Sequence, residues 1–393
     1  MITNILKSLE MDNQEKKFIS SLLLLIPLSL LHSYIRNKTW HVLPVVFLLY
    51  NAFGPAETAL YISVVLFNYI ILRSIKRFTK ISVSHIMVCF NLFIIMIYSA
   101  LEIYYEWDNR FTISGPLMLL TIKMFYAGIE YKESNSFKEF VGYSFYSPGI
   151  LTGPNPRYNE FIQENQNTKI DYISGILSII ESLLYVFLFC KFKDVYTVDK
   201  IIQSSDVFST MLNTAMLCFI CRTKYYFAWS YSNACYIFAS NNKMKSIYPL
   251  RVEFSTCVRD VTQSWNIYTN KWLKECVFMP LSNNLFVASM ATFFVSAFWH
   301  GLYPAYYLMF MSIGLIIPII KTNVKIFKSY GLSYLCYIQM MLVLSYFTLP
   351  FFLLDVKLTF TIWKKMYFIG HIYFIISGIN HYLFYDKGRL KNK

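Results

Sequence analysis

The stretch Phe298-Trp-His300-Gly-Leu-Tyr-Pro304 places an imidazole between two apolar segments. Residues 284–298 before it and 305–317 after it carry mostly apolar and small hydroxyl side chains, as membrane-buried segments do. The glycine and the proline disfavour a continuous helix through this point. An ionisable group inside a bilayer costs about 2.5–3.5 kcal/mol or more, so it usually marks function. His300 is therefore either a functional group or a packing histidine bonded to a backbone carbonyl, and these residues alone favour neither interpretation.

The composition is that of a membrane protein. Of the 393 residues, 56% are hydrophobic and 15% are charged, whereas soluble domains carry about 25% charged residues. The net charge of +14 fits basic loops on the anionic cytosolic face of a membrane. The chain has no arginine-rich arm or finger, so we expect no nucleic-acid partner.

The apolar runs predict an all-α, polytopic transmembrane protein with roughly 11 membrane helices in a single domain over residues 1–393. The runs cover residues 18–35, 42–53, 56–72, 83–101, 113–127, 140–151, 170–190, 207–221, 225–239, 284–298, 305–317, 332–354 and 361–385. Several are shorter than the roughly 20 residues that a spanning helix needs, which suits short or re-entrant helices around a central cavity. Residues 1–17 are polar and mixed in charge, so we expect the first run to be retained as a span.

The basic loop Arg73-Ser-Ile-Lys-Arg-Phe-Thr-Lys80 is the clearest orientation signal. The positive-inside rule places it in the cytosol together with residues 240–282 and the C-terminus, and places residues 102–111 and the N-terminus in the lumen. The sequon Asn37-Lys-Thr39 would then face the cytosol and stay unglycosylated.

Two further stretches stand out, one for its helix-breaking residues and one for its polar and aromatic residues at helical spacing. Residues 148–158, Pro-Gly-Ile-Leu-Thr-Gly-Pro-Asn-Pro-Arg-Tyr, form a breaker-rich turn that is either an ordinary loop or a functional one. Residues 261–273 have helical periodicity, with Trp265, Tyr268, Trp272 and Cys276 on one face and Asn266, Asn270 and Leu273 on a neighbouring face. A plain amphipathic interfacial helix would look much the same.

The eight cysteines lie mostly in or beside apolar runs. Cys218-Phe-Ile-Cys221 has the C-x-x-C spacing but no second pair, whereas a zinc site needs about four ligands. We expect packing thiols, no disulfide framework and no metal site.

The combination of Trp265-Asn266, Asn270-Lys-Trp-Leu273 and Ser296-Ala-Phe-Trp-His300-Gly-Leu-Tyr-Pro304 resembles the membrane-bound O-acyltransferases, and within them the lysophospholipid acyltransferase branch. Leu151-Thr-Gly-Pro154 looks like a motif of that branch, and Lys224–Trp229 and Thr121–Lys123 look like its segments more weakly. The resemblance covers residues 119–307. The chain departs from it at Ser232-Asn233 through Asn242, where relatives carry an acidic residue and a glycine-rich turn, and at Asn155-Pro-Arg157. Both departures bear on acceptor or acyl-chain preference.

The resemblance implies the fold of that family and transfer of a fatty acyl group from acyl-CoA to a lysophospholipid hydroxyl in a bilayer. His300 would be the general base, and Asn266 would orient its ring, bind the acceptor hydroxyl or stabilise the oxyanion. Acyl-CoA would be a co-substrate rather than a cofactor, with Lys271, Trp299, Arg222 and Lys224 as expected contacts. The resemblance implies a location in the endoplasmic reticulum membrane, and it leaves a homo-oligomer as one of the states that the protein could adopt.

Two alternatives remain. A transporter would explain an intramembrane histidine and broken helices, but it predicts internal symmetry between the halves of the chain, which the sequence does not show. A member of the same family could instead act on a sterol, a diacylglycerol or a protein. The sterol and diacylglycerol branch carries Phe-Tyr-x-Asp-Trp-Trp-Asn, of which only Trp265 and Asn266 are present.

Overall fold

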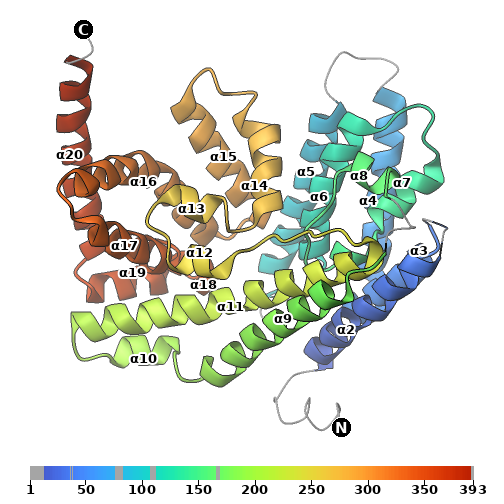
Figure 1. Ribbon diagram of the computed structural model, residues 1–393, viewed down its shortest axis with the longest axis horizontal. Coiled ribbons are helices and arrows are strands. Elements are labelled where there is room, and N and C mark those ends of the chain that lie inside the picture. Colours follow the sequence, from blue (N-terminus) through green and yellow to red (C-terminus); the bar gives the residue numbers. More distant parts are fainter. Residues whose placement is uncertain are drawn as a thin grey trace. The chain divides into compact units, whose positions relative to one another are not determined.

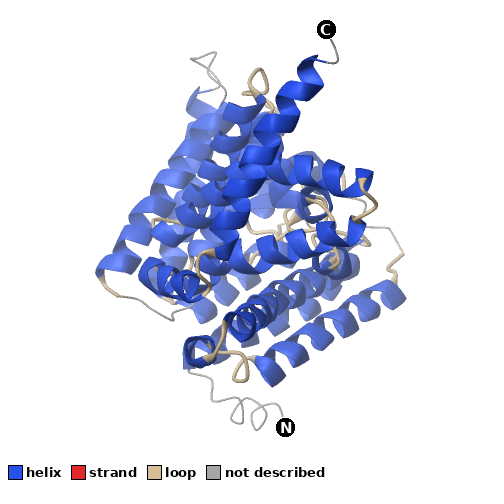
Figure 2. Cartoon of the chain, turned by 90° about the vertical axis from the view of Figure 1, so that its left-hand side faces the viewer, coloured by secondary structure: helices blue, strands red, loops and turns tan. Residues whose placement is uncertain are grey.

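The computed structural model describes residues 13–35, 37, 39–75, 83–106, 112–164 and 169–390 (Figure 1). Every regular element within these ranges is a helix, and none is a strand (Figure 2). In this part of the chain, six segments are long and apolar enough to cross a membrane: Asn13–Tyr34, Pro55–Ile75, Val83–Tyr104, Tyr172–Phe192, Pro304–Ser329 and Ser333–Leu353. The all-α membrane architecture is confirmed, whereas the count of about 11 membrane helices is not.

The helices fall into two compact units, of which the first comprises residues 1–181 and 228–245. Its helices are α2 (Asn13–Tyr34), α3 (Val42–Phe53), α4 (Pro55–Ile75), α5 (Val83–Tyr104), α6 (Ser114–Glu130), α7 (Phe137–Ser144), the short η1 (Ser147–Gly149), α8 (Tyr158–Ile162), the start of α9 (Tyr172–Phe192) and the end of α11 (Val207–Ser240).

The second unit comprises residues 182–227 and 246–393. It holds the rest of α9 and α11 together with α10 (Val198–Gln203), α12 (Pro249–Glu253), α13 (Val258–Thr262), α14 (Ile267–Leu273), the π-helical η2 (Lys274–Phe278), α15 (Leu285–His300), α16 (Pro304–Ser329), α17 (Ser333–Leu342), the π-helical η3 (Val343–Phe347), α18 (Leu349–Leu353), α19 (Val356–Lys365) and α20 (Ile369–Leu390).

Close helix contact in the first unit depends on small and paired polar side chains. A Cβ atom on Gly128 of α6 would lie 2.5 Å from the Ser84 Cα of α5, so only glycine lets these two helices approach this closely. Between α4 and α5 the buried amides of Asn68 and Asn91 bond to each other, with Nδ2–Oδ1 distances of 2.8 and 3.3 Å. Reciprocal bonding of this kind removes the cost of burying an amide in an apolar helix contact.

The second unit is built on an apolar core that includes α16, η3 and α19. Trp363 of α19 stacks on Tyr346 of η3 with ring centroids 5.1 Å apart, and its indole Nε1 donates to the Tyr346 carbonyl. The same core contains Cys218 of α11, whose thiol donates to the Ser345 carbonyl at 3.3 Å. This cysteine of the C-x-x-C pair is therefore a packing thiol.

Helix ends follow the predicted breakers at the central stretch. Asn284 caps α15 by accepting the backbone N–H groups of Phe286 and Val287. Gly301 ends α15 with φ 117°, and Pro304 begins α16 at a position where its missing N–H costs nothing. The expected break between the two apolar segments is confirmed.

Three predicted helix boundaries are wrong. The runs 207–221 and 225–239 form one helix, α11, because the stretch contains no glycine or proline and its charged Arg222 is paired inside the protein. The run 140–151 ends as a helix at Ser144, ahead of Pro148. The run 361–385 is broken after Lys365, since Tyr367 and Phe368 adopt left-handed backbone with φ 49° and 52°.

The orientation signals lie partly outside the described residues. This holds for residues 76–80 of the basic loop and for residues 107–111 of the expected lumenal loop. The membrane orientation therefore stays a prediction.

Candidate active site

His300, the last residue of α15, is surrounded by four aromatic side chains, which we call the aromatic cage. Ring centroids lie 5.1 Å from the imidazole for Trp299, Tyr306 and Phe351, and 5.3 Å for Phe310. Phe310 is stacked on the imidazole at 24°, whereas Phe351 meets it edge-on at 88°. Tyr306 and Phe310 come from α16 and Phe351 from α18, so the cage forms only when these helices pack together.

The His300 ring has no hydrogen-bond partner among the described residues. A packing histidine would bond to a carbonyl, which this ring does not do. The aromatic faces therefore orient the imidazole, and its nitrogens make no hydrogen bond within the described part of the chain.

Asn266 lies in a turn rather than in a helix, contrary to the helix predicted over residues 261–273. Helix α13 ends at Thr262, α14 begins at Ile267, and Asn266 has left-handed backbone with φ 45° and ψ 53°. Asparagine tolerates this region better than most residues do. The Asn270 side chain holds the turn by donating Nδ2–H to the carbonyls of Trp265 at 2.6 Å and Thr262 at 3.0 Å. Local periodicity missed the break because these bonds replace helical ones.

The side-chain amide of Asn266 is half-buried and makes no hydrogen bond within the described part of the chain. It therefore has one acceptor and two donor positions for a substrate or for His300.

Three ring contacts tie the neighbours of Asn266 to the neighbours of His300 within the second unit. Trp272 of α14 packs on Trp299 of α15 with centroids 5.6 Å apart, and both indoles are at least 96% buried, with exposures of 0% and 4%. Trp265 lies 5.6 Å from Tyr225 of α11, and Tyr225 lies 6.3 Å from Phe351 of the aromatic cage. The two proposed catalytic residues are thus anchored to one cluster of aromatic rings.

The four expected acyl-CoA contacts differ in exposure. Lys271 and Lys224 are exposed, and the Lys224 ammonium lies 5.6 Å from the Phe189 ring centroid. Trp299 is buried against Trp272. Arg222 is buried and directs its guanidinium to Glu253 and to the Leu344 carbonyl. Contact with acyl-CoA stays a prediction for all four, and the two lysines are the ones whose charges face outward.

The breaker-rich loop at residues 148–158 lies in the first unit and is held by side chains. Its Pro148 carbonyl accepts from Ser232 at 3.0 Å, its Thr152 carbonyl from Trp229 Nε1 at 3.1 Å, and its Pro154 carbonyl from Tyr236 at 2.7 Å. All three donors belong to α11, and the Gly153–Pro154 peptide is cis. The loop is therefore packed as a structural element, and a role in the reaction stays open.

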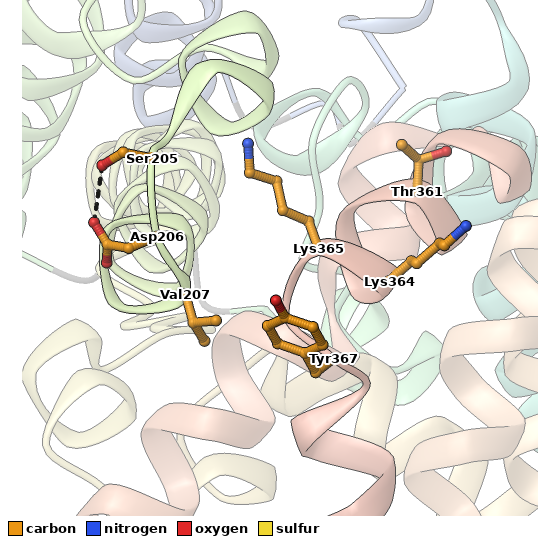
Figure 3. Close-up of a pocket in the computed structure, with 7 residues that line it drawn as sticks. All are labelled: Ser205, Asp206, Val207, Thr361, Lys364, Lys365 and Tyr367. Carbon is orange, nitrogen blue, oxygen red and sulfur yellow. Dashed lines mark hydrogen bonds between the residues drawn. The ribbon is translucent and has the colours of Figure 1, made fainter.

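An open pocket of about 630 Å³ lies elsewhere in the second unit (Figure 3). Its lining consists of Ser205, Asp206, Val207, Thr361, Lys364, Lys365 and Tyr367. Lys365 extends into the space toward Ser205 and bonds to the Ile202 carbonyl, whereas Lys364 points away from it (Figure 3). The pocket contains no predicted site residue, and its two ammonium groups do not converge on one ligand.

Two residues at or beside the site, Phe351 and Glu253, carry no sequence signal that could identify them. Phe351 and Glu253 lie 51 and 47 residues from His300 in the chain, outside any local motif. Among the described residues, no group of three or more His, Cys, Asp or Glu side chains could hold a metal ion.

Comparison with known proteins identifies the family. The model of the membrane-bound O-acyltransferase family matches residues 42–350, which is most of the chain and includes parts of both units. Among curated relatives, the lysophospholipid acyltransferase of Schizosaccharomyces pombe is 27% identical over 287 residues, covering 61% of this chain and 56% of the relative. Lysophospholipid acyltransferase 6 of Drosophila melanogaster is 28% identical over 308 residues, covering 71% and 40% respectively.

Membrane-bound glycerophospholipid O-acyltransferase 2 of Mus musculus is 26% identical over 328 residues, covering 66% of this chain and 62% of the relative. The chain spans about half the length of the curated relatives it matches. Together with its apolar helices, the family match makes this an integral membrane protein. The caged histidine and the motifs on either side of it thus lie within a matched region that covers most of the sequence, and the chain belongs to the membrane-bound O-acyltransferase family.

Proposed function

We propose that this protein transfers a fatty acyl group from acyl-CoA to the hydroxyl of a lysophospholipid. The observation that carries the proposal is His300, a histidine with no internal hydrogen-bond partner among the described residues, held in the aromatic cage of a chain from this family. The printed names of the matched relatives, which are lysophospholipid or glycerophospholipid acyltransferases, support the acceptor class.

His300 acts as the general base. A neutral imidazole, with an ordinary pKa of about 6.5, accepts the acceptor hydroxyl proton as that oxygen attacks the thioester carbonyl carbon. The tetrahedral intermediate collapses with cleavage of the carbon–sulfur bond, and the imidazolium returns the proton to the leaving thiolate. The products are a diacyl phospholipid and free CoA. A positioned base of this kind contributes about 10²–10⁴-fold in rate.

The aromatic cage assists the step in which His300 carries a positive charge. The Phe310 face is stacked on the imidazole, and an aromatic face attracts a nearby cation by about 0.5–2 kcal/mol. The charge exists only after proton transfer, so the interaction stabilises the reacting state more than the resting state. Asn266 supplies an amide beside this chemistry, either to orient the ring or to donate to the oxyanion.

The acceptor and the donor approach from different environments. A lysophospholipid keeps its single chain in the hydrocarbon while its glycerol hydroxyl meets His300, and acyl-CoA delivers its thioester from the aqueous side near the exposed Lys224 and Lys271. Holding the two reactants in register converts a bimolecular reaction into an effectively unimolecular one. Membership of the family implies both acyl-CoA as the donor and the endoplasmic reticulum membrane as the location, and we propose both for this protein.

An acceptor panel tests the proposal. Purified protein receives labelled long-chain acyl-CoA with lysophosphatidylcholine, lysophosphatidylethanolamine, other lysolipids, cholesterol or diacylglycerol, and the His300→Ala variant serves as the control. We expect labelled phospholipid from at least one lysolipid and about 10²–10⁴-fold slower formation by the control. Turnover of cholesterol or diacylglycerol alone would assign the protein to the other branch, and folded protein without any acyl transfer would remove the enzyme proposal.

A further inference from the structure

An ion pair between the buried Arg222 and the partly buried Glu253 lies next to the candidate active site and takes no part in the proposed proton transfer. Arg222 of α11 is 3% exposed and donates through Nε to Glu253 Oε1 at 2.8 Å and through Nη2 to Oε2 at 2.7 Å. Tyr226, one turn further along α11, donates its hydroxyl to the same carboxylate. Paired parallel bonds of this kind fix direction as well as distance, because the guanidinium and the carboxylate are both planar.

The third bond of Arg222 extends to the segment that carries Phe351, one of the four residues of the aromatic cage. Its Nη1 donates to the Leu344 carbonyl at 2.8 Å, inside the π-helical η3. Seven residues later Phe351 meets the His300 ring edge-on. One guanidinium therefore bonds both to Glu253 and to the segment that leads to the cage.

Glu253 in turn belongs to the segment that ends in Asn266. Two backbone bonds close this segment on itself, from Tyr248 N to the Ser264 carbonyl at 2.9 Å and from Ile267 N to the Ser246 carbonyl at 3.0 Å. Fixing Glu253 at the end of α12 therefore fixes the turn that presents Asn266.

Aromatic contacts link α11 to the same two parts of the site, the turn at Asn266 and the segment of Phe351. Trp265, next to Asn266, packs against Tyr225 at 5.6 Å and Tyr226 at 5.9 Å, and Tyr225 also contacts Phe351. The stretch 222–226 of α11 is thus a common support for both sides of the site.

We propose that Arg222 and Glu253 are positioning residues that hold Asn266 in register with His300. The inference rests on the proposed function, and it gives Arg222 and Glu253 a role through other residues in place of the acyl-CoA contact predicted for Arg222. A buried ion pair is a costly way to stabilise a fold, since apolar residues of similar volume do as well or better. Apolar packing lacks the direction of a bidentate pair, however, and a displacement of about 1 Å in a reacting group can cost about 100-fold in rate.

The central experiment replaces both charges at once. The double variant Arg222→Met/Glu253→Leu leaves no unpaired buried charge, and Arg222→Lys keeps the charge but loses the planar fork. The matched control is Lys245→Met/Glu181→Leu, which removes an ion pair of 3.1 Å in the first unit. For each variant the kcat, both KM values, the thermal midpoint and hydrogen exchange over residues 262–270 are measured.

We expect kcat of the double variant to fall about 10- to 100-fold while both KM values stay within about twofold, because positioning affects the reacting state. Exchange over residues 262–270 should accelerate, Arg222→Lys should show a smaller loss of kcat, and the control should keep both quantities. A folded double variant with the kcat and exchange of the parent protein would overturn the inference, as would raised KM values at unchanged kcat. If the double variant does not fold, Arg222→Lys decides by the same criteria.

The exchange measurement separates this inference from the proposed function. A parent protein without acyl transfer would refute the function, whereas unchanged exchange over residues 262–270 in the double variant would refute the positioning role whether or not the parent is active.

Discussion

Replacing Asn266 by glycine, alanine and aspartate separates the role of its backbone from that of its side chain. At φ 45° and ψ 53° the residue is left-handed, a conformation that costs an ordinary L-residue about 1–2 kcal/mol and costs glycine nothing. The glycine variant should therefore keep the turn and lose only the amide. The alanine variant should lose the amide and in addition destabilise the turn by about 1–2 kcal/mol.

The loss of rate identifies the role of the amide. An oxyanion donor is worth about 10²–10³-fold, so the glycine and alanine variants should both lose this much in kcat if Asn266 donates to the intermediate. Aspartate offers acceptor oxygens but no donor when ionised, so it should then be as poor as glycine. If Asn266 instead orients the imidazole by accepting its N–H, aspartate should retain most of the rate.

Single-turnover acyl transfer by detergent-purified protein measures the rate, and the thermal midpoint reports the turn. The alanine variant should have a lower thermal midpoint than the glycine variant, and the two variants should have the same rate of acyl transfer. A glycine variant with the turnover of the parent would refute the reasoning, because Asn266 would then be required only for its backbone conformation.

Three further predictions concern other residues. The His300→Ala variant should lose about 10²–10⁴-fold in kcat while still binding acyl-CoA in an equilibrium titration, and near-normal turnover would remove the general-base assignment. Phe310→Leu should lower kcat about 2- to 30-fold by removing the aromatic face on the imidazolium, whereas Phe294→Leu, which contacts Phe298 and Tyr307 instead, should leave it unchanged. Asn37 should carry no glycan in native membranes by mobility shift after deglycosylation, and a glycan there would reverse the predicted orientation.

Most of the helices could be predicted from the sequence because membrane helices are a local property. An apolar run of about 20 residues satisfies its own backbone hydrogen bonds and partitions into lipid wherever it occurs in the chain. The predicted runs at residues 42–53, 56–72 and 83–101 accordingly lie within α3, α4 and α5. The break between α15 and α16 could also be predicted from the sequence, since glycine and proline act on the backbone next to them.

Predictions failed where a distant residue changed the local preference. The basic Arg222 indicated a loop between two spans, yet Glu253, 31 residues away, neutralises it and lets α11 continue. Residues 261–273 have the spacing of one helix, but the Asn270 side chain bonds to the carbonyls of Thr262 and Trp265 and produces a turn at Asn266. Periodicity records which faces are apolar and contains no information about such side-chain bonds.

By itself, the sequence determined that the chain is a helical membrane protein, since hydropathy is carried by neighbouring residues. Its motifs resemble those of one acyltransferase family, and that resemblance made His300 and Asn266 the candidates for catalysis. Only the tertiary structure decided that aromatic side chains from α16 and α18 enclose His300 and that the imidazole has no internal hydrogen bond among the described residues. It also decided that Arg222 is paired with Glu253 rather than exposed. The physical reason is that these are contacts between segments far apart in the chain, and which distant segments meet depends on the packing of whole helices.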